Sequence, residues 1–212
     1  MPVDTNLKKE GMIYQREQYA KGGFGKKYWD YRDSVALKYV HGNRILDIGC
    51  GEGITLERLI KSYPDSDITG IDSELENIDI CRKHRLPIQY GTVYDLPIAS
   101  ASIDCVLFFE VIEHLDEPIN ALKEISRVLK PNGRIIFIFP NDVMFMISRI
   151  ITGMIKEAFY DSGHVRQWSP SKIRKVLKST GFRIHVQHSI PFFFWFMSLH
   201  HVVVAIKGCQ SS

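Results

Sequence analysis

The chain has 212 residues, of which 45% are hydrophobic, and this is enough for one domain with a sizeable buried core. Its 27 basic and 24 acidic residues give a net charge of +3 and show no long run of one sign, which argues against nucleic-acid binding. No uninterrupted stretch of about 18 apolar residues occurs, so a membrane span is not expected.

The cysteines and the N-terminal segment indicate the cellular compartment. Cys50, Cys81, Cys105 and Cys209 show no Cys-x-x-Cys spacing. The first residues, MPVDTNLKKE, contain no apolar signal segment. We therefore expect reduced thiols and a cytoplasmic protein.

Hydrophobic periodicity predicts strands that alternate with helices. The segment 1–42 is polar and aromatic, and a helix is expected over Asp33–Val40. The predicted strands are Arg44–Ile48, Asp67–Ile71, Ile88–Tyr90, Ile103–Phe109, Arg134–Phe139, Phe182–Ile190 and Leu199–Lys207. The other predicted helices are Ile54–Tyr63, Glu74–Lys83, Pro118–Leu129 and Pro170–Thr180, with a turn at Pro131–Gly133.

Such alternation is typical of βαβ units, so we expect an α/β fold with a doubly wound, mostly parallel sheet. Ile103–Phe109 is almost continuously apolar, as expected of a strand that is covered on both faces. No repeat or low-complexity linker divides the chain. Residues 1–212 are therefore predicted to form one domain, with an N-terminal helical segment over 1–42 and an apolar, lid-like insertion over 142–163.

The stretch ILDIGCGEG carries three glycines, Gly49, Gly51 and Gly53, where the first strand turns into a helix. Glycine costs conformational entropy on folding, so its use here indicates a strained turn or a ligand close to the backbone. Ligands of such sheets bind beyond the carboxyl ends of the strands. The spacing is tighter than the GxGxxG of dinucleotide sites, and Asp47 would repel a diphosphate but suits an ammonium group.

A second acid, Asp72, ends the next predicted strand. It follows the glycines by about 20 residues, where a carboxylate can accept both hydroxyls of a ribose. An adenosine that carries an amino acid would satisfy both Asp47 and Asp72. The two acids therefore make this pattern more specific than the glycines alone.

With these motifs the chain resembles class I S-adenosylmethionine-dependent methyltransferases, of the branch that includes ubiquinone-biosynthesis O-methyltransferases. The matching stretches are ILDIGCGEG, ITGIDSE, YGTVYDLP, FFEVIEHLDEP, LKPNGRIIFIFPN and GHVRQWSPSKIRKVLKSTGF, followed by the closing HHVVVAIKG. The resemblance implies a Rossmann-like, seven-stranded sheet with an antiparallel last strand. It also implies S-adenosylmethionine as cofactor and S-adenosylhomocysteine as product.

The resemblance assigns the methionine end of the cofactor to the glycine loop. The residues concerned are Asp47, Gly49, Cys50, Gly51 and Gly53. The missing side chains would let the backbone reach the ligand.

The resemblance assigns the adenosine end of the cofactor to residues at the ends of the next two strands. Asp72 would bind the ribose hydroxyls, and Ser73 would lie beside the adenine. Thr92 stands where many relatives carry an acid that reads the adenine amino group, and its hydroxyl is a weaker acceptor. Val93 would offer its backbone N–H to the ring, and Phe109 its carbonyl to the ammonium group.

The stretch Glu110-Val111-Ile112-Glu113-His114 allows two interpretations. If a helix begins at the end of the fourth strand, Glu110, Glu113 and His114 share one face and could bind a divalent metal such as Mg²⁺. The same ExxEH occurs as a metal site in ubiquinone-pathway and small-RNA 2′-O-methyltransferases, where a further histidine corresponds to His164. The metal-free interpretation makes the stretch a structural corner. His114 or His164 could then act as general base, with Glu113 a further catalytic candidate.

Two apolar segments remain, Asp142–Tyr160 and Pro191–Met197. They could be ordinary core, an interface between the subunits of a homodimer, or the rim of a pocket for a small hydrophobic or aromatic acceptor. The last interpretation also allows a monomer that touches a membrane surface peripherally.

Three functions are therefore open. The leading one is methyl transfer to a small hydrophobic acceptor, at oxygen. The second is RNA 2′-O-methylation through the ExxEH stretch, which the absence of a basic run disfavours. The third is a non-catalytic S-adenosylmethionine-binding module, which the presence of Asp47 and Asp72 disfavours.

Overall fold

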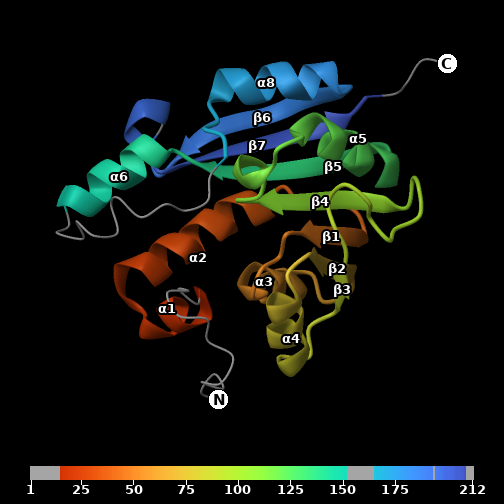
Figure 1. The fold of residues 1–212 in the computed structure, drawn as a ribbon, viewed down its shortest axis with the longest axis horizontal. Coiled ribbons are helices and arrows are strands. Elements are labelled where there is room, and N and C mark those ends of the chain that lie inside the picture. The colour runs from red at the N-terminus through yellow and green to blue at the C-terminus, as the bar shows by residue number, and fades with distance from the viewer. Residues whose placement is uncertain (1–14, 152–164, 193, 209–212) are drawn as a thin grey trace.

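The structure, a computed structural model, describes residues 15–151, 165–192 and 194–208 and is built on one seven-stranded sheet (Figure 1). The strand order is β3-β2-β1-β4-β5-β7-β6, with β7 antiparallel to both neighbours and every other pair parallel. The strands are β1 Arg44–Ile48, β2 Asp67–Asp72, β3 Ile88–Tyr90, β4 Ile103–Phe109, β5 Leu129–Pro140, β6 Phe182–Ile190 and β7 His200–Lys207. This confirms the predicted α/β fold with its antiparallel last strand.

Helices connect the strands and cover both faces of the sheet. They are α1 Gln15–Lys21, α2 Gly23–Leu37, α3 Ile54–Ser62, α4 Leu75–Lys83, α5 Pro118–Val128, α6 Asp142–Ile151 and α8 Pro170–Ser179, with 3₁₀ turns η2 Ile112–His114 and η3 Trp195–Met197. Among the described residues, none of these helices has the length and apolar character needed to cross a bilayer.

The helix predicted over Asp33–Val40 is wrong in its limits, because α2 begins at Gly23 and ends at Leu37. Its first turns have no apolar stripe, so hydrophobic periodicity does not predict them. These turns bury no side chain, and the buried residues that follow them include the charged Arg32 and Asp33. The helix therefore depends on tertiary ion pairs rather than on amphipathic packing alone.

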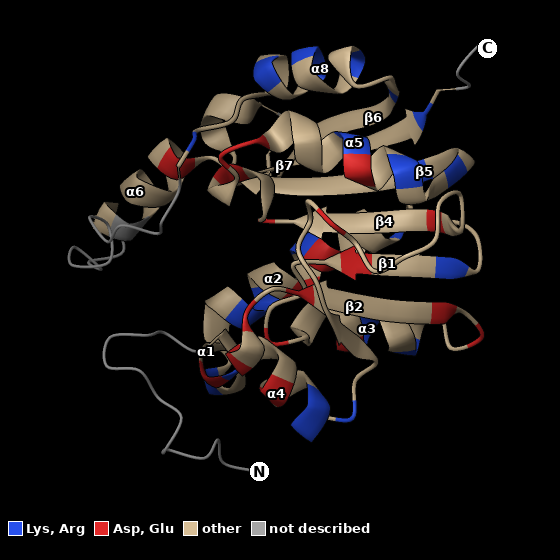
Figure 2. Cartoon of the chain, turned by 45° about the vertical axis from the view of Figure 1, so that its right-hand side comes forward, with Lys and Arg blue, Asp and Glu red and all other residues tan. Residues whose placement is uncertain are grey.

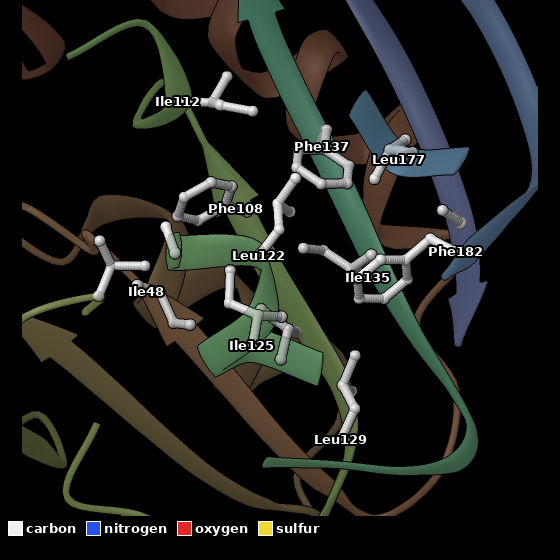
Figure 3. Packing of buried hydrophobic residues seen from close by; sticks show 14 of the residues in the cluster. Ile48, Phe108, Ile112, Leu122, Ile125, Leu129, Ile135, Phe137, Leu177 and Phe182 are labelled. Carbon is white, nitrogen blue, oxygen red and sulfur yellow. The ribbon is translucent and has the colours of Figure 1, made fainter. Parts of the chain in front are cut away.

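Alternate residues of the central strands point to opposite faces of the sheet and pack into two apolar clusters, one on each face. On one face α5 and α8 pack against Phe108 and Phe137, whose rings meet edge to face at 5.6 Å (Figure 3). On the other face α2 and α3 cover Leu107 and Ile136. Because both faces are covered, β4 is apolar almost throughout, as the sequence predicts.

The turn predicted at Pro131–Gly133 lies inside β5 as a bulge. Ile103 of β4 pairs with Leu129, but Cys105 pairs with Arg134, so the residues between them bulge out of the ladder. Asn132 takes the left-handed conformation, with φ 61°. Residues 131–133 do turn, but β5 begins at Leu129 rather than at the predicted Arg134, because a bulge can interrupt pairing without ending the strand.

The carboxyl ends of β1, β2 and β4 meet at one edge of the sheet, on the left in Figure 1. Helices α1, α2 and α6 lie at this edge. Acidic segments gather there at the end of β1 and in the following loops (Figure 2). This is the edge at which a doubly wound sheet binds ligands.

Candidate functional site

The three glycines after β1 all adopt positive φ, at 68° for Gly49, 55° for Gly51 and 78° for Gly53. A Cβ at Gly49 would lie 2.4 Å from Cγ2 of Val111, and one at Gly53 would lie 2.4 Å from Cδ1 of Leu86. Packing therefore requires these two glycines. At Gly51 a Cβ would meet nothing closer than 3.8 Å, so this glycine borders open space.

Asp72 ends β2 directly beside this loop. Its Oδ2 accepts the backbone N–H of Gly51 at 2.8 Å, and its Oδ1 accepts the N–H of Glu74 at 2.9 Å and the side-chain amide of Asn77 at 3.1 Å. The carboxylate is thereby fixed in position at the strand end. Of the roughly four acceptor sites of a carboxylate, one remains on Oδ2, and it can accept a ribose hydroxyl.

Asp47 is the other acid of the loop and is only 2% exposed. Its Oδ2 has no hydrogen-bond partner among the described residues. Burial, followed by the charges of Asp33 and Asp72, raises the pKa of Asp47 to about 8. A buried carboxylate oxygen without a partner is costly, so it fits a site that receives a cationic ligand group.

The remaining residues predicted to bind the cofactor surround this edge. Cys50 lies between the glycines, and Phe109 ends β4. Ser73 is exposed next to Asp72, while Thr92 and the buried Val93 form the turn after β3. The orphaned oxygen of Asp47, the fixed carboxylate of Asp72 and the open space at Gly51 together fit S-adenosylmethionine.

Glu52 connects the glycine loop to α1, an arrangement that sequence patterns did not reveal. Its carboxylate accepts the backbone N–H groups of Gln15 at 2.7 Å and Arg16 at 2.8 Å. The Arg16 guanidinium donates a hydrogen bond to the backbone carbonyl of Glu52 at 2.6 Å and another to the Glu57 carboxylate at 2.8 Å. Helix α1 is thus fastened over the loop that would hold the methionine end of the cofactor.

A second unpredicted feature is a buried ion-pair network between α2, α3 and the end of β4. Arg32 contacts Asp33 at 2.9 Å and Glu110 at 2.7 Å, while Asp33 also accepts bonds from Thr55, at 2.8 Å, and Arg58. The partners are distant in sequence, so no local pattern could have paired them. A pocket at this network is lined by Gln15, Trp29, Arg32, Cys50, Ile54, Thr55, Arg58 and Glu110.

The network continues into the last strand. His200 is fully buried, with Nε2 2.7 Å from Oε1 of Glu110 and Nδ1 2.8 Å from the hydroxyl of Tyr28. Burial lowers the pKa of His200, so the ring is neutral, donates to Glu110 and accepts the Tyr28 hydroxyl. Burial alone would raise the pKa of Glu110, but the charge of Arg32 and the His200 bond lower it below its usual range.

The helical face expected for Glu110, Glu113 and His114 does not form. Glu110 has φ 54°, and only Ile112–His114 make a short 3₁₀ turn, in which His114 is exposed. The premise is wrong because the chain turns sharply at Glu110 before any helix can start. Both oxygens of Glu110 are occupied by Arg32 and His200.

Glu113 has a different environment from Glu110. Its side chain is buried, and neither carboxylate oxygen has a partner among the described residues. Burial and the charge of Glu110 raise the pKa of Glu113 well above its usual value. A buried carboxyl group with a raised pKa beside a ligand edge is a candidate for proton transfer.

The predicted metal ligands are not brought together in the part of the chain that the structure describes. Within it, no three His, Cys, Asp or Glu side chains are placed to hold an ion, and His164 lies outside these residues. With Glu110 held by Arg32, the donor set does not fit a divalent cation. The metal site therefore stays a prediction.

The two apolar segments are arranged differently from each other. The described part of the first is α6, and residues 152–164 lie outside the described chain. In the second, Trp195 points inward, with its ring 5.7 Å from Phe139 and 5.4 Å from His201. Phe192, Phe194 and Phe196 are exposed.

Comparison with known proteins agrees with this geometry. The family profile described as "Methyltransferase domain" matches residues 46–137. A probable S-adenosylmethionine-dependent methyltransferase of Mycolicibacterium smegmatis is 28% identical over 165 residues, which are 75% of this chain and 61% of the relative. A ubiquinone biosynthesis O-methyltransferase of Cereibacter sphaeroides is 37% identical over 108 residues, which are 48% of this chain and 43% of the relative.

The chain therefore spans less than two thirds of the length of these relatives. Among solved structures, a SAM-dependent methyltransferase from Archaeoglobus fulgidus superimposes with a TM-score of 0.69 at 17% identity, covering 92% of this chain and 100% of the other. That likeness shows the shared fold. Profile, relatives and strand order agree that residues 46–137 carry a class I S-adenosylmethionine-dependent methyltransferase domain.

Proposed function

We propose that this protein transfers a methyl group from S-adenosylmethionine to an oxygen atom of a small hydrophobic acceptor. The observation that supports it most is the pair of acids at the ends of β1 and β2. Asp47 offers a buried oxygen without a partner to an ammonium group, and Asp72 offers a fixed carboxylate to a ribose. Between them Gly51 leaves space for the ligand.

The methyl group of bound S-adenosylmethionine sits on a sulfonium, whose departure needs no proton. The protein must instead hold the acceptor close and remove its hydroxyl proton. Glu113 is suited to this, because its buried carboxyl group has a raised pKa and no competing partner among the described residues. The neutral His200 is less suited, since Tyr28 and Glu110 occupy both ring nitrogens.

The acceptor class is inferred from the surroundings and from relatives. Val143 and Met146 of α6 expose apolar side chains beside the carboxyl edge of the sheet. The printed names of two relatives, the ubiquinone biosynthesis O-methyltransferase and an O-methyltransferase of Pyrenophora dematioidea, specify transfer to oxygen. An apolar phenol or catechol fits both indications.

The test uses S-adenosylmethionine with a labelled methyl group and a panel of phenols and catechols with apolar tails, together with amines and short RNAs. We expect label in an O-methyl ether. Glu113→Gln should lower turnover by roughly 10²–10⁴-fold with S-adenosylhomocysteine binding retained. Asp116→Asn, an exposed neighbour, is the matched control.

Label found on nitrogen or in RNA would replace the proposed acceptor class. Full activity of Glu113→Gln would remove Glu113 as the base. Binding of S-adenosylhomocysteine without transfer to any acceptor would instead favour a non-catalytic module.

A further inference from the structure

The charge of the chain is unevenly distributed. After Asp161 the sequence contains no aspartate or glutamate, but it contains seven lysines and arginines. All 24 acidic residues therefore lie in the preceding part, which the small net charge of the whole chain conceals. Such asymmetry within one chain is typical of proteins that meet an anionic partner on one side.

Helix α8 carries the centre of this positive charge. Lys172, Arg174, Lys175 and Lys178 are all exposed, and Figure 2 shows the helix with basic segments and no acidic ones. Lys172 contacts the carbonyl of Gln167, and Arg174 contacts the side-chain amide of Gln187. None of the ion pairs among the described residues includes these four cations, so their charges are available to a partner.

An apolar loop follows the strand on which α8 packs. Phe192, Phe194 and Phe196 are 55%, 56% and 67% exposed, and Met197 is 47% exposed. The rings of Phe194 and Phe196 stack at 5.5 Å. Three exposed phenylalanines in one short loop form an apolar surface. Exposing it to water does not stabilise the monomer, so it indicates an interaction site.

The loop is held in this exposed conformation by its own bonds. The Ser198 hydroxyl donates to the carbonyls of Phe192 and Phe194 at 2.6 and 2.9 Å, and the Asn141 amide donates to the carbonyl of Trp195 at 2.9 Å. Trp195 enters the core while its neighbours face outward. The exposure is thus part of the folded architecture.

The basic helix and the apolar loop adjoin through β6. Gln187 of β6 donates to the carbonyl of Pro170 at the start of α8, and η3 follows the end of the same strand. Asn141, which binds η3, immediately precedes α6 with its exposed Ile150 and Ile151. Figure 1 shows α6, η3 and the start of α8 at the same corner of the molecule.

We propose that this corner, comprising α6, η3 and α8, docks on the surface of an anionic lipid bilayer. The phenylalanines, with Ile150 and Ile151 of α6, would enter the boundary between headgroups and acyl chains, while the α8 cations face the anionic headgroups. This goes beyond methyl transfer, since it concerns where the protein sits rather than what it catalyses.

Other occupants fit the same surface less well. A second copy would bring another acid-free, basic helix towards the first, which like-charge repulsion opposes. Nucleic acid would use the cations and could stack on phenylalanine, but it has no use for exposed aliphatic side chains such as Ile150 and Ile151. A bilayer accounts for both kinds of side chain.

The test is co-sedimentation of the full chain with vesicles of phosphatidylcholine alone or mixed with phosphatidylglycerol. We expect binding to the anionic vesicles only, weakened by salt. Lys172→Gln with Lys175→Gln should weaken binding roughly fivefold per charge removed, which corresponds to about 1 kcal/mol each. Phe194→Ser with Phe196→Ser should weaken it by roughly tenfold or more.

Lys61→Gln with Lys83→Gln is the matched control, because it removes the same charge from exposed positions on α3 and α4 and should leave vesicle binding unchanged. Circular dichroism checks that each variant is folded. Equal binding to neutral vesicles, an equal loss in the control, or no vesicle binding would overturn the proposal. So would a dimer that Phe194→Ser with Phe196→Ser dissociates, or RNA binding without vesicle binding.

Discussion

The carboxylate of Glu52 accepts the backbone N–H of Gln15 at 2.7 Å, across 37 positions of the sequence. The first turn of a helix has N–H groups without intrahelical partners, and here a residue of the glycine loop supplies the acceptor. The segment over the candidate cofactor site is therefore held by the same loop that would contact the cofactor.

We expect Glu52→Ala to release α1. Loss of bonds from Gln15 and Arg16 to a charged acceptor should cost about 1.5–3 kcal/mol each at most. Amide hydrogen exchange should show faster exchange in α1, with β4 and β5 unchanged. Glu57→Ala removes a bond from the Arg16 side chain and a contact with His84 but keeps both backbone bonds to Glu52, so it should have a smaller effect. Unchanged exchange in α1 would show that Glu52 does not hold it.

Asp72→Ala should weaken S-adenosylhomocysteine binding by about 1.5–3 kcal/mol, through lost charge-assisted hydrogen bonds to the ribose. Calorimetry measures the change. Asp67→Ala is the control, because Asp67 begins the same strand at the opposite edge and pairs with Arg44 in an exposed position. An undiminished affinity in Asp72→Ala, or tighter binding of a nicotinamide dinucleotide to the unmodified protein, would contradict the cofactor assignment.

Two glycine substitutions should separate folding from binding. Gly49→Ala places a Cβ against Val111 at 2.4 Å, so it should lower the melting temperature. Gly51→Ala meets no such contact but projects into the space assigned to the ligand, so it should chiefly lower cofactor affinity, with about 1 kcal/mol of backbone strain. Thermal melts and calorimetry on both variants check this. Equal losses of stability and affinity in the two would contradict the distinction.

The ionisation of Asp47 should make cofactor binding depend on pH. Its pKa is raised to about 8, so below that value the free protein holds the neutral acid, which suits an ammonium group poorly. Affinity for S-adenosylhomocysteine should rise roughly tenfold per pH unit up to about 8 and then level off. 5′-Methylthioadenosine, which lacks the amino acid, should show no such slope, and Asp47→Asn should abolish it.

The same shift affects stability in the opposite direction. The folded protein binds the Asp47 proton more tightly than the unfolded chain, so the free energy of unfolding without ligand should fall as pH rises from 3.8 to about 8. Asp47→Asn should flatten this decline in chemical denaturation. A decline as steep in the variant would assign it to other groups.

Turnover should be insensitive to a chelator, because Arg32 and His200 occupy the carboxylate that a metal would need. Activity with and without a chelator, followed by added Mg²⁺, measures this. Abolished turnover that Mg²⁺ restores would support the metal interpretation, with His164 as a ligand.

The seven strands and nearly all of their limits could be predicted, because apolar runs and turn residues are local signals. The start of α2 could not, since its first turns bury no side chain, and the bulge at Asn132 could not, since it depends on pairing with β4. In the site, Asp47 and Asp72 were found by their places at strand ends. Glu52 and His200 were not, because their roles come from partners that only the tertiary fold brings near.

The bond between Tyr28 and His200 also bears on how the site is assembled. The two residues are 172 positions apart, and His200 also fixes Glu110. During synthesis, α2 cannot complete its polar contacts until β7 has left the ribosome and entered the sheet. The pocket beside Arg32 should therefore be the last part of the described chain to mature, and newly made protein should gain cofactor affinity only when its final strand is in place.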